Sequence, residues 1–582
     1  MTGLPPVAAP VLAAAVDALP NRLRRKLDDT VTAAASWPVS VHNGQTTVAV
    51  DDSTTVTVSA PDGTVTEPGQ VTCTCLLAPN CLHRAAVLAR APVADPVAVA
   101  DAGPADPTGP AVEEEPERLT EAQRAAAEQL WQAGTAVLGA GVSGTGVVLR
   151  TALLRATHEA RVHGLHRAAA AGRAIAAHLH AARELQPQYR LADLTDQVRE
   201  LLTVTRKLGD PDLPPDRVPG LVGTARRRYD LHGSLRLYGL CTVPVVAETG
   251  YAGVVTYLVD RDARLWTVAD LMPGGEERAL AAAEATVALG EAALSHRALG
   301  RDGLVVSGAT ASDVGGLGAG KAVRAVRATG AGWTEEPLSR LWEEPIADQV
   351  RRAFAALALP VTDRPAGADL LFLSGRLDGV RDGVHLATAD GAVLRLTVPS
   401  DHATLPYREN LTLLAGAAGL DVRLVGRPDP VRPQVVHPLA LAAADLALPA
   451  DWAGHLDLGL DRLRRKHFAA EPAGGPLGQA PPAPAGDLAL HLVRRHVERV
   501  VSGGRAVQAL AAPDEHRVRA ARLETGAGLL RALTTAAGHR PRDPFGRPLT
   551  DDAATFAQAW LSVAVYEQAA SWAFSEASWL PR

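Results

Sequence analysis

Alternation of apolar and polar residues marks a run of short strands near the start of the chain. The segments are Val39–Val41, Thr47–Val50 and Thr55–Ser59. Turn signals at Asn43-Gly44 and Asp62-Gly63 separate them, which predicts antiparallel strands joined by tight turns. Val71-Thr72 continues the pattern as a strand, and Arg84–Arg90 has the composition of a short helix. Residues 37–91 are therefore predicted to form a hairpin, a strand and a helix.

Helical patterns occupy both ends of the chain and its middle. Val11–Asp29 is amphipathic and is the main element of an N-terminal helical segment, residues 1–36. Thr120, with Gln123 three residues later, predicts a capped helix start for a helical domain at residues 119–210. Residues 487–582 are helical again. A stripe at helical spacing near their end is assigned to the core: Phe556, Trp560, Val563 and Ala570.

Two β-rich stretches lie between the helical regions. Residues 211–345 contain short apolar runs joined by turn signals, which predict an antiparallel sheet, and a helix is expected at Glu276–Leu294. The runs are Leu235–Leu237, Thr242–Ala247, Val254–Val259 and Leu265–Val268. In residues 346–468, alternation resumes over Asp369–Val398. A compact β-barrel and a small α+β domain both fit these patterns.

Two further segments have the composition of linkers. Residues 92–118 are rich in Ala, Pro and Asp and include the acidic run Glu113-Glu114-Glu115. Residues 469–486 are rich in Pro, Gly and Ala. Together with the patterned segments, these linkers predict a multidomain α+β protein. It has a small hairpin, strand and helix module, a helical middle, β-rich central domains and a helical C-terminal region.

The composition narrows the class of protein. The 582 residues carry a formal net charge of −6, which argues against a protein that coats nucleic acid over its whole surface. Met1–Leu19 lacks a basic leader and contains Pro5, Pro6 and Pro10. These features are not typical of a signal peptide, so none is predicted. Because no segment has about 20 uninterrupted apolar residues, no membrane span is predicted either. We therefore expect a cytoplasmic protein.

Cysteine and histidine gather in one short segment. Three of the four cysteines, Cys73, Cys75 and Cys81, share a window of eleven residues with His83. Each close pair places two ligands on one turn, and a five-residue spacer brings the pairs together. Three thiolates and an imidazole suit tetrahedral Zn²⁺, and four protein ligands predict a single structural ion without catalysis. Accidental grouping is one alternative; a disulfide, the other, would be strained and would leave one thiol unpaired.

The order of these ligands resembles a known zinc module. Cys73, Cys75, Cys81 and His83 form C-x-C-x₅-C-x-H, which resembles the SWIM-type zinc finger, C-x-C-xₙ-C-x-H. The abundance of alanine and arginine is typical of a GC-rich bacterial genome, and the organisation is similar to that of bacterial SWIM-containing proteins. The resemblance implies zinc binding and an interaction with DNA or protein, and it covers only the segment 37–91.

Basic residues near the finger form a candidate phosphate-contacting patch. They are Arg22, Arg24, Arg25, Lys26 and Arg84, with Arg90 beyond them. An ordinary solvated helix face is the alternative. The overall negative charge favours a protein partner over DNA.

Two glycine-rich segments imitate nucleotide-binding loops. Residues 139–144 match G-x-G-x-x-G, but a helical segment precedes them and no second strand with an acidic residue follows. Residues 315–321 end in Gly320-Lys321, but Ala322 stands where Ser or Thr should hold Mg²⁺. We expect a bend between helices and a glycine-rich loop. The alternative function is a nucleotide-dependent enzyme that uses one of these segments.

The remaining reactive residues add no catalytic motif. His158-Glu159 with His163 misses the i,i+4 spacing of a zinc helix, and Cys241 is predicted to be a small buried apolar residue. Oxidation of the three clustered thiols with release of zinc is a third hypothesis. The sequence thus predicts a non-catalytic adaptor protein with no evident small-molecule substrate. It does not identify the partner, the oligomeric state or the task of residues 119–582.

Overall fold

Contacts in the computed structural model group the chain into two compact units. The structure describes residues 3–42, 44–94, 118–186, 189–224, 229–247, 251–318, 323–380, 383–417, 419–468, 487–511, 514–539, 544–545 and 552–579. The first unit contains the described residues up to 224 together with 491–567, and the second contains 229–490 and 568–579. The predicted linker 469–486, most of the predicted linker 92–118, and Asn43 and Lys321 lie outside the described residues.

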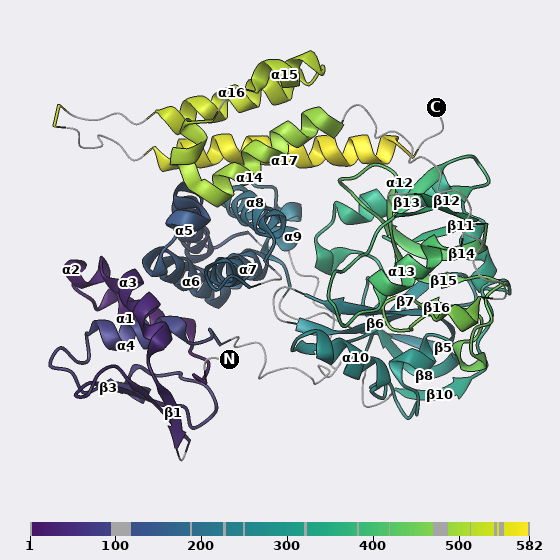
Figure 1. Cartoon of the computed structure of the whole chain (residues 1–582), viewed down its shortest axis with the longest axis horizontal. Helices are drawn as coiled ribbons and strands as arrows, with labels where there is room; N and C mark the ends of the chain where they lie inside the picture. Colours follow the sequence, from purple (N-terminus) through teal and green to yellow (C-terminus); the bar gives the residue numbers. More distant parts are fainter. Residues whose placement is uncertain are drawn as a thin grey trace. The chain divides into compact units, whose positions relative to one another are not determined.

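An antiparallel meander forms the sheet of the first unit (Figure 1). Its strands are β1 (Val39–His42), β2 (Gln45–Ala49), β3 (Thr55–Ser59) and β4 (Val71–Cys73), in the order β1-β2-β3-β4. Inward positions alternate along these strands, so Val48, Val56 and Val58 are buried. The helix α4 (Leu82–Arg90) follows. The predicted hairpin, strand and helix are confirmed.

Three short helices precede this sheet where the sequence pattern predicts one. They are α1 (Ala9–Asp17), α2 (Asn21–Arg24) and α3 (Leu27–Ala33). Pro20 lies between α1 and α2. It has no N–H to donate to a helix, and its ring disfavours the helical conformation of Leu19 before it. The prediction of one continuous helix over Val11–Asp29 is therefore wrong, although most of its residues are helical.

Helices make up the rest of the first unit. In the middle of the chain they are α5 (Glu121–Gly144), α6 (Val147–Val162), α7 (His166–Arg183), α8 (Leu191–Leu208) and α9 (Val218–Val222). Near the C-terminus they are α14 (Asp487–Ala509), α15 (Glu515–Ala520), α16 (Glu524–Gly538) and the beginning of α17 (Ala553–Ala577). The predicted cap is confirmed, because the Thr120 hydroxyl accepts a hydrogen bond from the Gln123 backbone N–H at 3.2 Å. None of the helices in the described part of the chain is long and apolar enough to cross a membrane.

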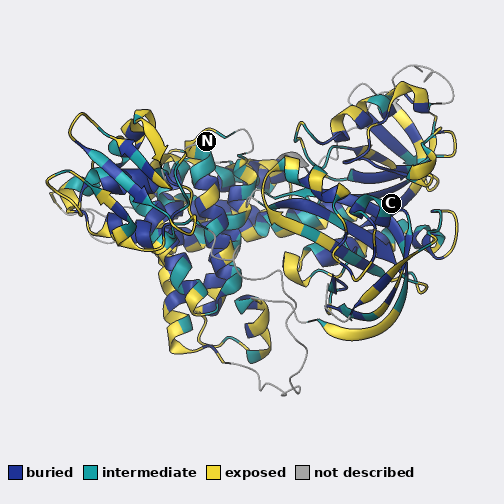
Figure 2. Ribbon diagram, turned by 90° about the horizontal axis from the view of Figure 1, so that it is seen from below, coloured by how far each residue is buried: buried dark blue, intermediate teal, exposed yellow. Residues whose placement is uncertain are grey.

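One hydrophobic core joins the small sheet to both sets of helices. Figure 2 shows the buried positions, in dark blue, running along the inner faces of helices and strands. Phe556, Trp560 and Val563 of the predicted stripe belong to this core, and the Trp560 indole N–H donates to the Val497 carbonyl at 3.0 Å. The small sheet and its helices therefore do not depend on a core of their own.

Polar contacts also fix the helices next to the small sheet to α6. Asp28 of α3 accepts a hydrogen bond at 2.9 Å from the backbone N–H of Val147, the first residue of α6. A carboxylate at this position satisfies an unpaired N–H and is favoured by the helix dipole. Arg150 of α6 is buried and donates to the carbonyl of Ala89 in α4 at 2.7 Å. The last turn of α4 is thus held to the helical part of the unit.

Two kinked helices cross at glycines. Gly141 within α5 has φ 68° and Gly504 within α14 has φ 74°, and both interrupt the helical conformation. A Cβ on Gly141 would lie 2.7 Å from the carbonyl carbon of Gly503 and 2.9 Å from Cα of Gly504. The segment 139–144 is therefore a bend inside a helix, packed closely against another backbone. Such a bend lacks the strand that must precede a dinucleotide-binding loop.

The first strands of the second unit, β5 to β10, form a small and mainly antiparallel barrel. β5 (Asp230–Val246) pairs with β6 (Tyr251–Val259) and β8 (Gly303–Ala311), β6 pairs with β7 (Leu265–Pro273), and β9 (Leu317–Gly318) and β10 (Arg324–Ala328) pair with β8. A parallel bridge between Thr267 and Gly316 closes the ring between β7 and β9. The helix α10 (Glu276–Glu284) lies between β7 and β8 in the sequence, and the short α11 (His296–Leu299) follows it.

A second barrel repeats this connectivity. Its strands are β11 (Leu371–Val380), β12 (Gly383–Thr388), β13 (Val393–Leu396), β14 (Asp421–Pro428) and β15 (Val435–Ala442). β11 pairs with β12 and β14, β14 pairs with β15, and β13 closes the ring by pairing with β12 and, in parallel, with β15. The helix α13 (Tyr407–Ala415) again lies between the third and fourth strands. This strand order and helix position are those of the OB-fold, a Greek-key barrel.

Two elements of the second unit differ from the sequence prediction. One long β5, with a register shift between Gly239 and Cys241, replaces two short predicted strands. The helix expected over Glu276–Leu294 ends at Glu284 as α10. Beyond it, Gly290 has φ 55°, and a Cβ there would lie 2.5 Å from the Ala325 backbone nitrogen. This segment is a loop packed against β10, and a continuing helix could not make that close approach.

The glycine crossing gives a direct stability test. Gly141→Ala should lower the free energy of unfolding of the first unit by roughly 3 kcal/mol, because it adds backbone strain and a clash with α14. The matched control is Gly139→Ala in the same segment, where a Cβ would meet nothing within 4 Å. That change should be neutral or stabilise by up to about 1 kcal/mol. Chemical denaturation of the full chain compares the variants, and equal effects would contradict this account.

Candidate functional site

The end of β4 and the start of α4 position the clustered cysteines and the histidine. Cys73 is the last residue of β4 and pairs with Val56 of β3, while Cys81 is the N-cap of α4 and His83 lies in its first turn. The Cys81 Sγ accepts the Arg84 backbone N–H at 3.5 Å. Thr74, between the first two cysteines, accepts the Thr55 backbone N–H at 2.9 Å. Regular structure on both sides therefore fixes where the two ligand pairs lie.

The four predicted ligands converge. One donor atom from each of Cys73, Cys75, Cys81 and His83 lies within 4.8 Å of all the others. The Cys73 Sγ and the His83 Nδ1 are 4.0 Å apart. A tetrahedral zinc ion with ordinary bond lengths requires ligand separations of about 3.5 to 3.8 Å. A small inward movement thus suffices, and this Cys₃His cluster could hold one metal ion.

A buried arginine, Arg84, connects the segments next to the four candidate ligands by hydrogen bonds. The Arg84 guanidinium donates to the carbonyls of Val71 at 2.9 Å, Pro79 at 3.2 Å and Pro68 at 2.6 Å. Only 5% of Arg84 is exposed, so its side chain does not lie in a phosphate-contacting patch, contrary to the sequence prediction. Arg84 directly follows His83 in the sequence. This position is equally compatible with an exposed arginine and with a buried one that connects β4 to the ligand loop. Trp37 adds an edge-on ring contact to His83, with centroids 6.0 Å apart.

The thiols influence one another's protonation. Burial raises the pKa of Cys73 to about 12, and burial also raises the pKa of Cys81. Burial acts in the same direction on Cys75, but hydrogen bonds from the Leu77 backbone and the neighbouring thiols outweigh it and lower the Cys75 pKa. Metal binding would displace protons from the thiols, because only thiolates coordinate.

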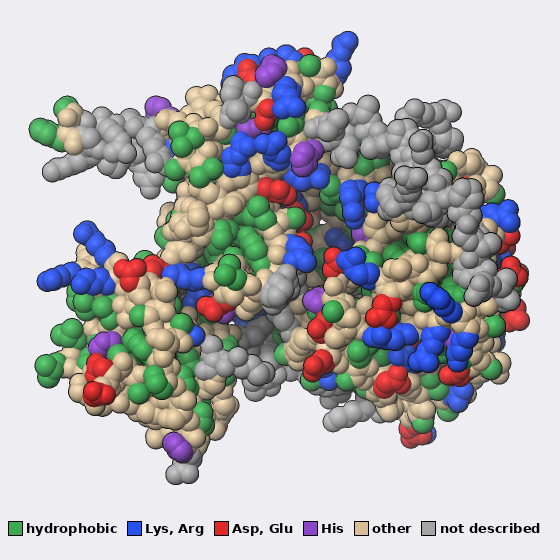
Figure 3. All heavy atoms as spheres, viewed as in Figure 1, with side chains coloured by type: hydrophobic (Ala, Val, Ile, Leu, Met, Phe, Trp, Pro, Cys, Tyr) green, Lys and Arg blue, Asp and Glu red, His purple; other side chains and the backbone are tan. Residues whose placement is uncertain are grey.

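The other predicted basic residues lie on or beside α2. Arg22, Arg25 and Lys26 are exposed. Arg24 is half-buried and donates to the backbone carbonyls of Leu19, at 2.9 Å, and Asp17. Figure 3 shows basic side chains, in blue, gathered over α2 and separate groups of hydrophobic side chains, in green, elsewhere on this part of the molecule.

The loop between the ligand pairs ends in an apolar tip. Leu76 is fully exposed, and Leu77 is 62% exposed. Both come directly after Cys75, and the Arg84 hydrogen bond to the Pro79 carbonyl connects the far end of the same loop to α4. Adjacent exposed apolar residues can form part of an interaction surface. No sequence pattern distinguishes them from core leucines.

The motifs that the sequence analysis discounted have other roles. Gly315 and Gly316 directly precede β9, Gly315 accepts from the Thr267 N–H at 3.0 Å, and the next element among the described residues is the strand β10. Cys241 is fully buried, as predicted, and burial raises the pKa of its thiol. His180 contacts Arg150 at 3.1 Å. Among the described residues, the Cys₃His cluster is the one group with metal-binding geometry.

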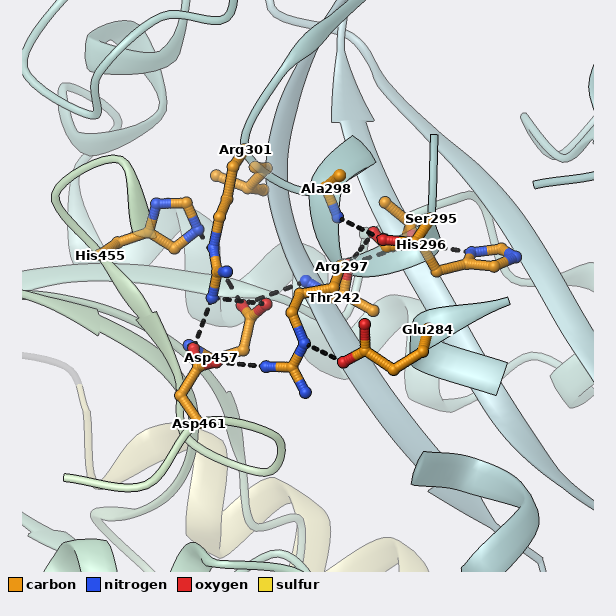
Figure 4. A network of polar contacts seen from close by, with 12 residues as sticks. Thr242, Glu284, Ser295, His296, Arg297, Ala298, Arg301, His455, Asp457 and Asp461 are labelled. Atoms are coloured by element: carbon orange, nitrogen blue, oxygen red, sulfur yellow. Dashed lines mark hydrogen bonds and ion pairs between the residues drawn. The ribbon is translucent and has the colours of Figure 1, made fainter. Parts of the chain in front are cut away.

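A buried charge cluster in the second unit was not anticipated. Figure 4 shows Arg301 between His455 on one side and Asp457 and Asp461 on the other. Asp461 pairs with Arg301 at 2.6 Å and also with Arg297, whereas the nearest Arg301 nitrogen is 3.9 Å from Asp457. Asp457 is fully buried and accepts the Thr242 N–H at 3.1 Å. Its Oδ2 has no hydrogen-bond partner among the described residues.

Arg301, His455, Asp457 and Asp461 of this cluster are all buried. Burial, reinforced by the neighbouring Asp461, raises the pKa of Asp457 to about 7. Burial and the positive charge of Arg301 lower the pKa of His455 to about 3, so this imidazole is neutral. Its members come from β5, from α11 and the turn after it, and from the segment after β15, so the cluster joins the two barrels. Only the spacing of Asp457 and Asp461 hints at it in the sequence.

Comparison with known proteins gives no assignment. No protein-family model matches the chain, and neither a curated protein nor a solved structure matches it. The likeness to the SWIM-type finger therefore rests on the ligand pattern and on the geometry described above.

The metal centre predicts a stoichiometry. The purified full chain should carry one tightly bound metal ion, which Cys73→Ser and His83→Ala should each lose. Cys241→Ala, a matched change in a cysteine far from the cluster in sequence, should keep it. Elemental analysis with thiol titration measures both quantities. A chain without metal whose cysteines all titrate as free thiols would contradict the prediction.

The buried cluster predicts a pH dependence of the second unit. Folded Asp457 keeps its proton up to about pH 7, whereas an unfolded aspartate releases it near pH 3.8. The folded state therefore binds the extra proton between these values, and stability should fall as the pH rises through this window and level off above pH 7.

Asp457→Asn should remove this slope and raise the melting temperature of the second unit at pH 8. It keeps an oxygen that can accept from Thr242 and removes the buried charge. The control, Asp461→Asn, breaks the arginine pairs and should destabilise by about 3 kcal/mol. Calorimetry between pH 5 and 8 measures both variants, and an unchanged slope in Asp457→Asn would assign the effect to another group.

Proposed function

We propose that this chain is a SWIM-type zinc protein that acts as a non-catalytic adaptor for a protein partner. The observation that carries the proposal is the convergence of Cys73, Cys75, Cys81 and His83 within 4.8 Å around a loop with an apolar tip. Three thiolates and one imidazole favour zinc over harder cations, and four protein ligands leave no position for a reacting water.

The loop chemistry favours protein over DNA as the partner. The tip consists of Leu76 and Leu77 and carries no charge, whereas phosphate contacts require arginine or lysine. Arg84, the basic residue nearest the ligands, is buried by its bonds to three carbonyls. Arg22, Arg25 and Lys26 remain available on and beside α2, and DNA binding through them is the second outcome that an experiment must test.

The partner test compares apolar and basic surfaces of the same unit. Leu76→Asp with Leu77→Asp should abolish crosslinking to the partner in cells that express the full chain, while metal content stays at one ion per chain. The matched control is Leu510→Asp, which alters a leucine that is 87% exposed and distant in sequence from the loop. The control should crosslink as the unchanged protein does.

A parallel arm tests DNA. Fluorescence anisotropy with single- and double-stranded oligonucleotides should show no salt-dependent binding. If binding occurs and falls when Arg22, Arg25 and Lys26 are changed to Gln, the partner is nucleic acid and the protein-adaptor proposal is wrong.

A further inference from the structure

The outer surface of the second barrel contains a hollow of about 920 Å³. Four adjacent strands, β12, β11, β14 and β15, form its floor. Residues 332–334 and parts of the segment 443–454 complete the lining. A hollow of this size is within the range of small-molecule binding sites. It lies within one unit, far in sequence from the metal ligands.

Small side chains create the hollow. The outward positions on the floor include Ser374, Ala387 and Ala442, and the inward positions of the same strands pack into the barrel core. Further along the same outer face, Phe372, Val425 and Ala440 are covered by Trp333 and Leu338. Ser374, Ala387 and Ala442 lie beyond these covered residues. Because their side chains are small, they leave a hollow that larger side chains would have filled.

One arginine on the floor lacks a carboxylate partner. Arg423 of β14 is half-buried, and none of the ion pairs among the described residues includes it. It donates to the Trp333 carbonyl, and its guanidinium carbon lies 5.4 Å from the Trp342 ring centroid. Arg376 and Asp421 face each other at 3.9 Å and offset each other's charge. The floor therefore retains the positive charge of Arg423.

The aromatic side of the hollow is rigid. Trp333 stacks on His455 with centroids 4.9 Å apart and lies 5.0 Å from Trp342. The indole N–H groups of Trp333 and Trp342 donate to the carbonyls of Leu240 and Leu373, at 3.0 and 3.1 Å. Because the group that holds Arg423 is itself fixed, the guanidinium is oriented before any ligand arrives, which lowers the entropic cost of binding.

We propose that this hollow binds a small amphipathic anion. A carboxylate or phosphate group contacts Arg423, which presents planar N–H donors suited to either group. An apolar body of the ligand lies along the alanine floor and against Leu448 and Pro449. This assignment is independent of the metal centre and of the adaptor function. It requires both the charge of Arg423 and the empty space over Ala442.

The experiment separates charge from space in the full chain. The fluorescent sulfonate 8-anilinonaphthalene-1-sulfonate serves as the probe, and octanoate and octyl phosphate serve as competitors. Both competitors should displace it, and their relative affinities distinguish a carboxylate from a phosphate ligand. Octanol, which lacks the charge, and inorganic phosphate, which lacks the apolar body, should displace it at least tenfold more weakly.

Variants identify the site. Arg423→Gln, which keeps a donor for the Trp333 carbonyl, should weaken probe binding at least tenfold, and Arg423→Lys should weaken it less. Ala442→Leu fills the hollow without altering charge and should abolish binding. Arg408→Gln, an exposed arginine of the same barrel on α13, is the control and should bind as the unchanged chain does. Unchanged affinity in Arg423→Gln, or displacement by octanol as strong as by octanoate, would overturn the proposal.

Discussion

The burial of α4 is the constraint on which the metal centre depends. Six consecutive residues, Arg84 to Ala89, are buried, although the helix begins at the ligands Cys81 and His83. Half of these residues are alanines, which allow close packing against α1 and α3. The Arg150 bond to the Ala89 carbonyl fixes one end, and the Arg84 bonds to β4 and the ligand loop fix the other. The histidine ligand is therefore positioned by a helix that the whole unit holds in place.

This arrangement changes the expected role of the metal. A module of fewer than about 70 residues would need zinc to fold, as small zinc fingers do. Here the small sheet shares one core with the helices, and Val56, Val58 and Val71 are buried in it without help from the cluster. The metal would then order the loop between Cys75 and Cys81 and its leucine tip, while the unit stays folded. Loop order is therefore the property that a bound metal would affect first.

Periodicity predicted the small sheet and several of the barrel strands, while residue spacing predicted the candidate metal ligands and the capped start of α5. These features are local, because spacing along the chain decides them. The expected helix over Val11–Asp29 disregarded Pro20, whose effect on the helix is local. The end of α10 and the burial of Arg84 were not predicted, since each depends on a tertiary contact. A guanidinium needs three carbonyls from distant positions to be buried, and Gly290 needs the approach of β10. Pairs such as Gly141 with Gly504, or Asp457 with Thr242, are invisible to any local pattern.

The repeated barrel explains why the second unit offers two different environments. In both barrels a helix separates the third and fourth strands, and outer faces of the two barrels share a core that includes Tyr257, Phe372 and Val425. Where the faces meet, charge is buried and paired, as at Arg301 and Asp461. Where the contact ends, the face of the second barrel carries alanines and Arg423, which has no carboxylate partner among the described residues. A fold of this kind hosts many functions, so the chemistry at that open face, and not the barrel itself, indicates what it binds.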